Sequence, residues 1–220
     1  MTPILYVVAT PIGNPDDITL RALKVLKEVD LVICEEYKNG SRLLKKYGIK
    51  NSLIELNEHN EKEQSEYILK EILMEGKTAA LISDAGAPLF ADPGGNLVSM
   101  CHYYNIKVKP IPGASSLISA LMGAGNVKKF VYYGFLPANK IKRKEAIKKL
   151  PKNIDIILLE TPYRLKQLLK DLTKYFGENK NAIIAYKLTM PQERFIFGKL
   201  KELSDFDIPK GEFVLILKNG

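Results

Sequence analysis

The sequence has few cysteines, no long apolar run and none of the common motifs for binding metals or nucleotides. Cys34 and Cys101 are too few for a disulfide framework and do not have the spacing of metal ligands, so both are predicted to be small buried residues. No apolar run reaches the roughly 20 residues that cross a bilayer, and the N-terminus carries neither a basic flank nor a cleavage site. We therefore expect a cytoplasmic protein that holds no metal and binds no membrane.

Three catalytic and nucleotide-binding motifs are missing. No GxGxxG follows the first predicted strand, no GxxxxGK[ST] occurs, and HExxH is absent, which disfavours a Rossmann dinucleotide site, a P-loop and a zinc protease. The composition is that of a globular protein, with 46% hydrophobic and 26% charged residues in a chain of 220. Low-complexity, collagen-like and coiled-coil structures are thereby excluded.

Positive charge is concentrated in the second half of the chain. Residues 1–110 carry 13 Lys and Arg against 15 Asp and Glu, whereas residues 111–220 carry 20 against 10. This imbalance favours a polyanionic partner for the second half, with a solubilising lysine coat as the alternative. Residues 128–152 contain a single acid, Glu145, and nine basic residues. The basic residues are Lys128, Lys129, Lys140, Lys142, Arg143, Lys144, Lys148, Lys149 and Lys152. They suit an RNA backbone, or else form an ordinary solvated helix face.

Strand-length apolar runs alternate with helix-period segments through the first half, which predicts βαβ units and a mainly parallel sheet. After Gly123 and Gly125 the strands become more frequent and the predicted sheet is mixed. The fold class is therefore α/β, with an N-terminal lobe over residues 1–124 and a C-terminal lobe over residues 125–220 that carries the basic helix.

Three loops of unusual composition follow predicted strands of the first lobe, at residues 10–19, 83–94 and 111–116. Each combines glycine, proline and short hydroxyl side chains, which allow a ligand to approach the backbone closely. A single loop of this kind is an ordinary strand-to-helix turn with a helix cap. Three at the same end of one sheet predict a ligand site.

A co-linear set of motifs runs along almost the whole chain: Ala9-Thr10-Pro11-Ile12-Gly13-Asn14, Asp17–Leu23, Glu58-His59-Asn60-Glu61, Ser83-Asp84-Ala85-Gly86, Gly134-Phe135-Leu136-Pro137 and Gly211–Leu215. In these motifs the sequence resembles the tetrapyrrole methylase superfamily. It is most similar there to the branch of ribosomal RNA small-subunit methyltransferases that modify the ribose 2′-hydroxyl of a decoding-site cytidine. The resemblance has several implications. It implies a two-lobed tetrapyrrole-methylase-like fold, S-adenosylmethionine bound folded between the lobes, and a homodimer.

The resemblance also implies which residues bind the cofactor. The cofactor positions are Pro11, Ser83, Asp84, Ala85, Gly86, Phe90, Ser115, Ser116, Glu160 and Leu188. Asp84 has an alternative role as a residue that stabilises its turn.

A ribose hydroxyl is weakly acidic, so a carboxylate within hydrogen-bond reach assists by taking its proton. By sequence, Glu35 and Glu36 are the best placed carboxylates; Glu36 is our candidate, and a solvated loop charge is the alternative.

The predicted substrate side comprises Arg42, His59, Lys142, Arg143, Lys144 and Arg164. His59 has an alternative place in the start of a helix that Asn60 caps. This side departs most from the branch: Glu35-Glu36-Tyr37-Lys38 replaces Glu-Asp-Thr-Arg, Thr161-Pro162-Tyr163-Arg164 replaces Ser-Pro-His-Arg, and the usual C-terminal extension is missing after Leu217.

Three functions remain open. The favoured one is methylation of ribosomal RNA, with RNA or the small ribosomal subunit as partner and no role for DNA. The alternatives are methylation of a tetrapyrrole or another small molecule, and a non-catalytic RNA-binding module of the same fold. Salt-dependent RNA affinity would separate the first from the second.

Overall fold

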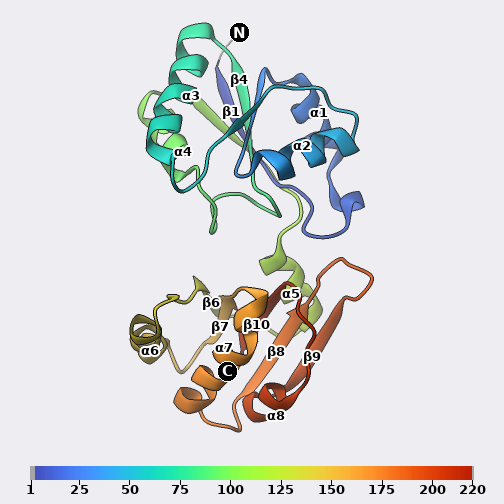
Figure 1. Ribbon diagram of the computed structural model, residues 1–220, viewed down its shortest axis with the longest axis vertical. Helices are drawn as coiled ribbons and strands as arrows, with labels where there is room; N and C mark the ends of the chain where they lie inside the picture. Colours follow the sequence, from blue (N-terminus) through green and yellow to red (C-terminus); the bar gives the residue numbers. More distant parts are fainter. Residues whose placement is uncertain (1–2, 220) are drawn as a thin grey trace. The chain divides into compact units, whose positions relative to one another are not determined.

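A computed structural model describes residues 3–219, apart from the side chains of residues 73 and 74. The chain forms two compact units, the first ending at Ser115 and the second beginning at Ser116 (Figure 1). We expected the boundary after residue 124. The difference is one helix, α5 (Ser116–Ala124), which packs on strands of the second sheet.

The first unit is a five-stranded parallel sheet in the order β3-β2-β4-β1-β5. Its strands are β1 (Ile4–Val8), β2 (Leu31–Cys34), β3 (Leu53–Glu55), β4 (Thr78–Ile82) and β5 (Lys107–Ile111). Its helices are η1 (Pro15–Asp17), α1 (Leu20–Glu28), α2 (Tyr37–Lys46), α3 (Glu61–Glu75) and α4 (Gly95–Tyr103). The predicted parallel sheet is confirmed.

Helices cover both faces of this sheet, with α1 and α2 on one face and α3 and α4 on the other (Figure 1). Alternate residues of one strand therefore enter different cores: Leu5 packs with α3 and α4, whereas Val8 packs with α1 and α2. Cys34 and Cys101 lie one in each core, with exposures of 1% and 0%, so the prediction that both are buried is confirmed.

Polar side chains near the helix starts take different roles. Asp16 and Asp17 form η1, and Thr19 caps α1 by accepting from the Ala22 amide at 3.0 Å. Asn60 does precede α3, but its side chain makes no cap bond there. It donates instead to the Glu55 carbonyl oxygen at 3.3 Å and ties this turn to the end of β3.

The second unit is a mixed five-stranded sheet, which confirms the predicted mixed sheet, and its strand order is β6-β7-β10-β8-β9. Its strands are β6 (Phe130–Phe135), β7 (Asp155–Leu159), β8 (Asn181–Tyr186), β9 (Arg194–Lys199) and β10 (Phe213–Leu217). Only β6 and β7 are parallel; the other pairs are antiparallel. Besides α5 and η2 (Pro162–Arg164), the described part of this unit contains α6 (Lys140–Lys149), α7 (Leu165–Phe176) and α8 (Leu200–Asp205).

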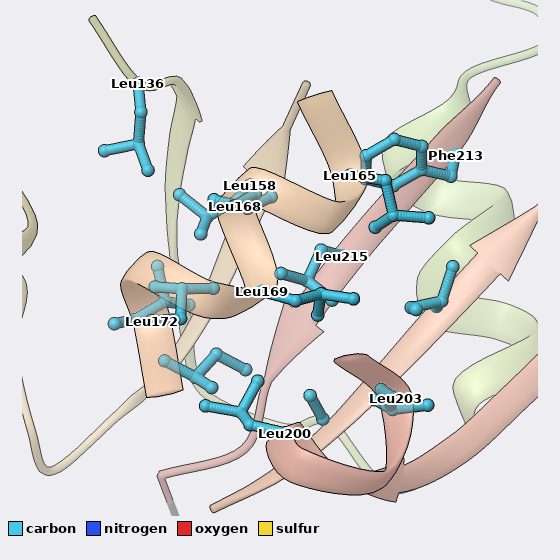
Figure 2. Close-up of a cluster of buried hydrophobic side chains, with 14 of the residues drawn as sticks. Leu136, Leu158, Leu165, Leu168, Leu169, Leu172, Leu200, Leu203, Phe213 and Leu215 are labelled. Carbon is cyan, nitrogen blue, oxygen red and sulfur yellow. The ribbon is translucent and has the colours of Figure 1, made fainter. Parts of the chain in front are cut away.

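One face of the second sheet carries the main core of this unit. Leu158 and Leu215 point from the sheet toward Leu168 and Leu169 of α7, and α6 and α8 close the sides (Figure 2). α5 covers part of the opposite face. Its Gly123 lies so close to the Phe195 ring that a Cβ at this position would stand 2.0 Å from Cζ. The carboxyl ends of β6, β7 and β8 meet at one edge of this sheet.

Candidate active site

The predicted ligand loops of the first unit leave three adjacent strands at the same edge. β4, β1 and β5 are neighbours in the sheet and parallel, so the loops after Ile82, Val8 and Ile111 emerge side by side. In open α/β sheets, ligands bind at this carboxyl edge. The structure thus brings together the loops that the sequence places far apart.

Hydrogen bonds tie the first two loops into one unit. The Thr10 amide donates to the Gly86 carbonyl oxygen at 2.9 Å, and the Gly86 amide donates back to Thr10 Oγ1 at 3.1 Å. Thr10 Oγ1 donates in turn to the Ser83 carbonyl oxygen at 3.1 Å. Thr10 and Ser83 are both buried, with exposures of 1% and 3%, so water does not compete for these bonds.

Glycine is required at two points of this loop cluster. Gly86 has φ +87°, and a Cβ there would lie 3.0 Å from Ile12 Cγ2. Gly113 brings the third loop against β1, where a Cβ would stand 3.1 Å from the Cβ of Ala9. The Ala9 amide donates to the Ile111 carbonyl oxygen at 3.1 Å and fixes that approach. A side chain at either glycine would push the loops apart.

The cluster leaves backbone donors for a ligand. Ala85 and Gly113 are exposed, and neither amide donates to an acceptor within residues 3–219. A nucleoside with an amino-acid tail offers adenine, ribose and carboxylate groups that such amides bind. The donor set of this edge therefore fits S-adenosylmethionine.

The remaining predicted cofactor residues fall into two groups. Pro11, Asp84 and Phe90 belong to the loops just described, Phe90 with 62% of its surface exposed, and Ser115 closes the first unit. Ser116, Glu160 and Leu188 belong to the second unit, where Glu160 follows β7 and Leu188 follows β8 at its carboxyl edge. Their contacts with a cofactor stay predictions.

Three acidic side chains gather beside the loop cluster. Asn39 Nδ2 donates to Glu36 Oε2 at 2.8 Å and to Asp84 Oδ2 at 2.6 Å, which links the end of β2 to the loop after β4. Glu35 is half-buried next to them. Burial, and then the negative charges around it, raise the pKa of Glu35 to about 7; these charges are those of Asp84, Asp92, Glu58 and Glu36.

This arrangement changes the relative standing of the two candidate bases. Glu36 is exposed and accepts a hydrogen bond from Asn39, whereas the carboxyl of Glu35 titrates near neutral pH. A general base works best when its pKa lies near the operating pH. Glu36 stays a prediction, and the structure favours Glu35 of the pair.

Two predicted substrate residues of the first unit lie beside this edge. His59 is exposed in the turn after β3, where its amide donates to Asn57 Oδ1 at 3.0 Å. Arg42 lies on α2, the helix that follows Glu36. β2 and β3 are parallel neighbours, so the start of α2 and the turn that contains His59 follow strands at the same edge of the sheet.

The basic helix α6 is not uniformly solvent-facing, and the prediction for Arg143 needs correction. Lys142 and Lys144 are exposed, but the Arg143 side chain is 8% exposed and faces two buried carboxylates. Its Nη1 lies 3.8 Å from Glu160 Oε2 and its Nε lies 3.9 Å from Asp171 Oδ2. Arg143 is thus part of the interior of the second unit, where an RNA phosphate cannot reach it.

Glu160 also pairs with Arg164, which adds a fourth charged residue to this ion cluster. Glu160 has a fully buried side chain whose Oε1 accepts from the Thr161 amide at 2.8 Å and pairs with Arg164 Nη1 at 3.5 Å. The Glu160 carboxylate is thus engaged within the second unit, and its contact with a cofactor stays a prediction. Arg164 retains 38% side-chain exposure and could still meet a substrate.

Sequence reasoning missed two features of the site. The first is Asn39, which has no local signal because its partner Asp84 is 45 residues away. The second is the backbone around Leu188, where Lys187 and Thr189 have φ values of +47° and +65°. Non-glycine residues with positive φ store strain and gather at functional sites. Both flank a predicted cofactor contact.

No helix within residues 3–219 is long and apolar enough to span a bilayer. In the same residues, no group of three or more His, Cys, Asp and Glu side chains has the arrangement of a metal site.

Comparison with known proteins identifies the class. A family model described as Tetrapyrrole (Corrin/Porphyrin) Methylases matches residues 4–204. Together with the two-sheet α/β fold and the loop cluster, this match defines a methyltransferase. The chain belongs to the tetrapyrrole methylase family.

Two curated relatives and one solved structure are similar to this chain. The chain is 42% identical to "Ribosomal RNA small subunit methyltransferase I" of Buchnera aphidicola, over 98% of this chain and 78% of the relative. It is also 42% identical to the protein of the same name from Thermotoga maritima, over 97% of both chains. In structure, it is similar to the uroporphyrin-III C-methyltransferase of Thermus thermophilus complexed with S-adenyl homocysteine, with a TM-score of 0.64, 19% identity, and coverage of 97% of this chain and 96% of that one.

Proposed function

We propose that this protein is an S-adenosylmethionine-dependent methyltransferase that acts on a ribose 2′-hydroxyl of small-subunit ribosomal RNA. The observation that carries the proposal is the 42% identity to the Thermotoga maritima relative, which extends over 97% of each chain.

The loop cluster of the first unit is the part of the chain that holds the cofactor. Thr10 and Gly86 fix the loops, and the free amides of Ala85 and Gly113 bind its polar groups. S-adenosylmethionine, when bound, supplies a methyl group that is attached to a sulfonium sulfur. Once the methyl group is transferred, the sulfonium becomes a neutral thioether and is the leaving group. No strong nucleophile is needed, because correct positioning lowers the barrier by several kcal/mol, on the order of 7 or more in the best cases.

The carboxylates after β2 are the groups that take the proton of the ribose hydroxyl. Burial raises the pKa of Glu35 to about 7, which is the range in which a carboxylate accepts a proton effectively at neutral pH. Asn39 orients Glu36 and Asp84 beside it. Arg42 and His59, at the same edge, bind the RNA, and Lys142, Lys144 and Arg164 supply phosphate contacts from the second unit.

The alternative of a tetrapyrrole substrate has weaker support. Structural neighbours with that activity are 19% identical to this chain, which argues for a shared fold alone.

Because ribosomal subunits are the proposed substrate, we also propose that the protein acts in the cytoplasm. We also propose a homodimer, supported by Ile118 and Met122, which lie one turn apart on α5 with exposures of 51% and 78%. Sedimentation equilibrium measures the mass of the protein in solution and thereby tests the proposed homodimer.

Transfer of a radiolabelled methyl group tests the proposed reaction. We expect label in the RNA of small subunits from cells that lack the corresponding modification, and none in fully modified subunits, which are the matched control. Digestion to nucleosides should place the label on a ribose. Cofactor that binds the protein without any label entering RNA would overturn the proposal.

A further inference from the structure

A groove of about 1090 Å³ lies at the edge of the second sheet opposite Glu160 and Leu188. Its walls come from the segment after α5, the amino ends of β7 and β8, and the carboxyl ends of β9 and β10; they include Lys128, Lys129, Asn153, Asn181, Phe197 and Lys218. Strand β7 separates the two edges, because it begins at Asp155 in the groove and ends just before Glu160. None of the predicted cofactor or substrate residues lines this groove.

The groove carries uncompensated positive charge. Its one acidic side chain, Asp155, is 4% exposed and pairs with Lys218, which also donates to the Asn126 carbonyl oxygen at 3.0 Å. Lys128 and Lys129 are exposed, and neither makes an ion pair within residues 3–219. Two free ammonium groups on one wall attract an anion.

An exposed aromatic ring forms part of the same groove. Phe195 and Phe197 point to the same face of the edge strand β9, because side chains alternate along a strand. The ring of Phe195 packs against Gly123 of α5, but the helix ends at Ala124 and leaves Phe197 61% exposed. A bare phenylalanine ring beside lysines is the arrangement that binds single-stranded nucleic acid, since bases stack on the ring and phosphates meet the ammonium groups.

We propose that this groove binds a single-stranded segment of the RNA substrate, with a base stacked on Phe197 and the backbone held by Lys128 and Lys129. The inference rests on the proposed function and adds a second RNA contact at the opposite edge of the sheet. The exposed amides of Asn153 and Asn181 are suited to base edges. A second copy of this chain is a poorer occupant, because its own basic groove would bring like charges together.

Two sets of variants of the full chain test the groove. The first is K128Q/K129Q, with K170Q/K174Q as the matched control: Lys170 and Lys174 are exposed on α7, which covers the other face of the same sheet. The second is Phe197→Ala, with Phe197→Tyr as the conservative variant that keeps a stacking ring. The probes are a fluorescein-labelled oligouridylate, followed by anisotropy, and methyl transfer to unmodified small subunits.

We expect K128Q/K129Q to weaken oligouridylate binding several-fold and to reduce the slope of log K against log salt by about 1.4, from about 0.7 per charge on a single strand. Phe197→Ala should weaken binding about tenfold and Phe197→Tyr should restore it. Both defects should appear in the KM for subunits, with affinity for S-adenosylhomocysteine unchanged.

Three results would overturn the inference. Wild-type affinity in both groove variants, or equal losses in K170Q/K174Q, would remove the RNA from this groove while leaving the proposed function intact. A halved mass of Phe197→Ala in sedimentation equilibrium would instead assign the groove to a second copy. Failure of the proposed function has a different signature, because wild-type protein would then transfer no methyl group to RNA.

Discussion

Thr10 and Gly86 hold each other through two hydrogen bonds, one from the Thr10 amide to the Gly86 carbonyl oxygen at 2.9 Å and one from the Gly86 amide to Thr10 Oγ1 at 3.1 Å. The pair joins the ends of two strands that are 76 residues apart in sequence. Both residues are buried, so no water replaces the bond from the Gly86 amide if the Thr10 hydroxyl is lost.

Thr10→Val therefore tests the loop cluster with little change in side-chain volume. The substitution leaves the buried Gly86 amide without its acceptor, which costs about 1–3 kcal/mol of unfolding free energy. We expect that loss in urea denaturation, together with weaker binding of S-adenosylhomocysteine in calorimetry. Thr10→Ser keeps the hydroxyl and should retain most of the affinity. Equal affinity in Thr10→Val and wild type would show that the loops do not hold the cofactor.

Asp84→Ala separates a binding role from a turn-stabilising one. Asp84 is exposed, and its Oδ2 accepts from Asn39 at 2.6 Å. We expect about a tenfold loss in affinity for S-adenosylhomocysteine, the size of one hydrogen bond to a charged group. Asp207→Ala, which removes a 94% exposed acid of the second unit, is the control for net charge. Unchanged affinity in calorimetry would remove Asp84 from the cofactor site.

Glu35 gives methyl transfer a specific pH dependence. With a pKa of about 7, the carboxyl is protonated at lower pH and cannot accept the ribose proton. We expect the single-turnover rate to rise tenfold per pH unit below 7 and to level off above it. Glu35→Gln should abolish this rise and most of the rate. A profile that is unchanged in Glu35→Gln but lost in Glu36→Gln would assign the proton to Glu36.

The same carboxyl predicts a stability change of opposite sign. Its pKa rises from 4.5 to about 7 on folding, so the folded state binds the proton more tightly than the unfolded state. The resulting stabilisation is fully present below pH 4.5 and is lost as the pH rises through 7. Above pH 7, Glu35→Gln should melt at a higher temperature than wild type. The advantage should shrink as the pH falls from 7 toward 4.5; a lower melting temperature at high pH would contradict the shift.

The sequence predicts strands well where both faces of a sheet are covered. Strands β2 and β4 are continuous apolar runs apart from Thr78, because helices cover both faces of this sheet, and the predicted parallel sheet is found there. Side-chain direction on α6 is a different problem. Its basic residues follow one another with almost no apolar period, and the partners that draw Arg143 inward, Glu160 and Asp171, are 17 and 28 residues away. The Asn39 bridge to Asp84 is non-local for the same reason.

Lys142 and Lys144 are the two predicted RNA contacts of α6 that point to solvent. Neutralising both as K142Q/K144Q should weaken binding of ribosomal RNA several-fold and flatten its salt dependence, because each lost phosphate contact removes about 0.7 from the slope on a single strand. Fluorescence anisotropy over a salt series measures both quantities, with K170Q/K174Q as the control. Unaltered slopes would identify this part of α6 as an ordinary solvated surface.

Arg143 should behave differently from its two lysine neighbours. It is a buried cation between Glu160 and Asp171, and its Nη2 donates to the Ala138 carbonyl oxygen at 3.2 Å, which fastens α6 to the loop after β6. Arg143→Met leaves the buried Asp171 carboxylate without an ion-pair partner and Glu160 with Arg164 alone, so we expect a loss of about 3–5 kcal/mol in unfolding free energy by urea denaturation. Arg143→Lys keeps the charge and should lose less. The salt dependence of RNA binding should not change in Arg143→Lys, because this residue contacts no phosphate. A flattened slope with wild-type stability would instead place Arg143 on the RNA-binding surface.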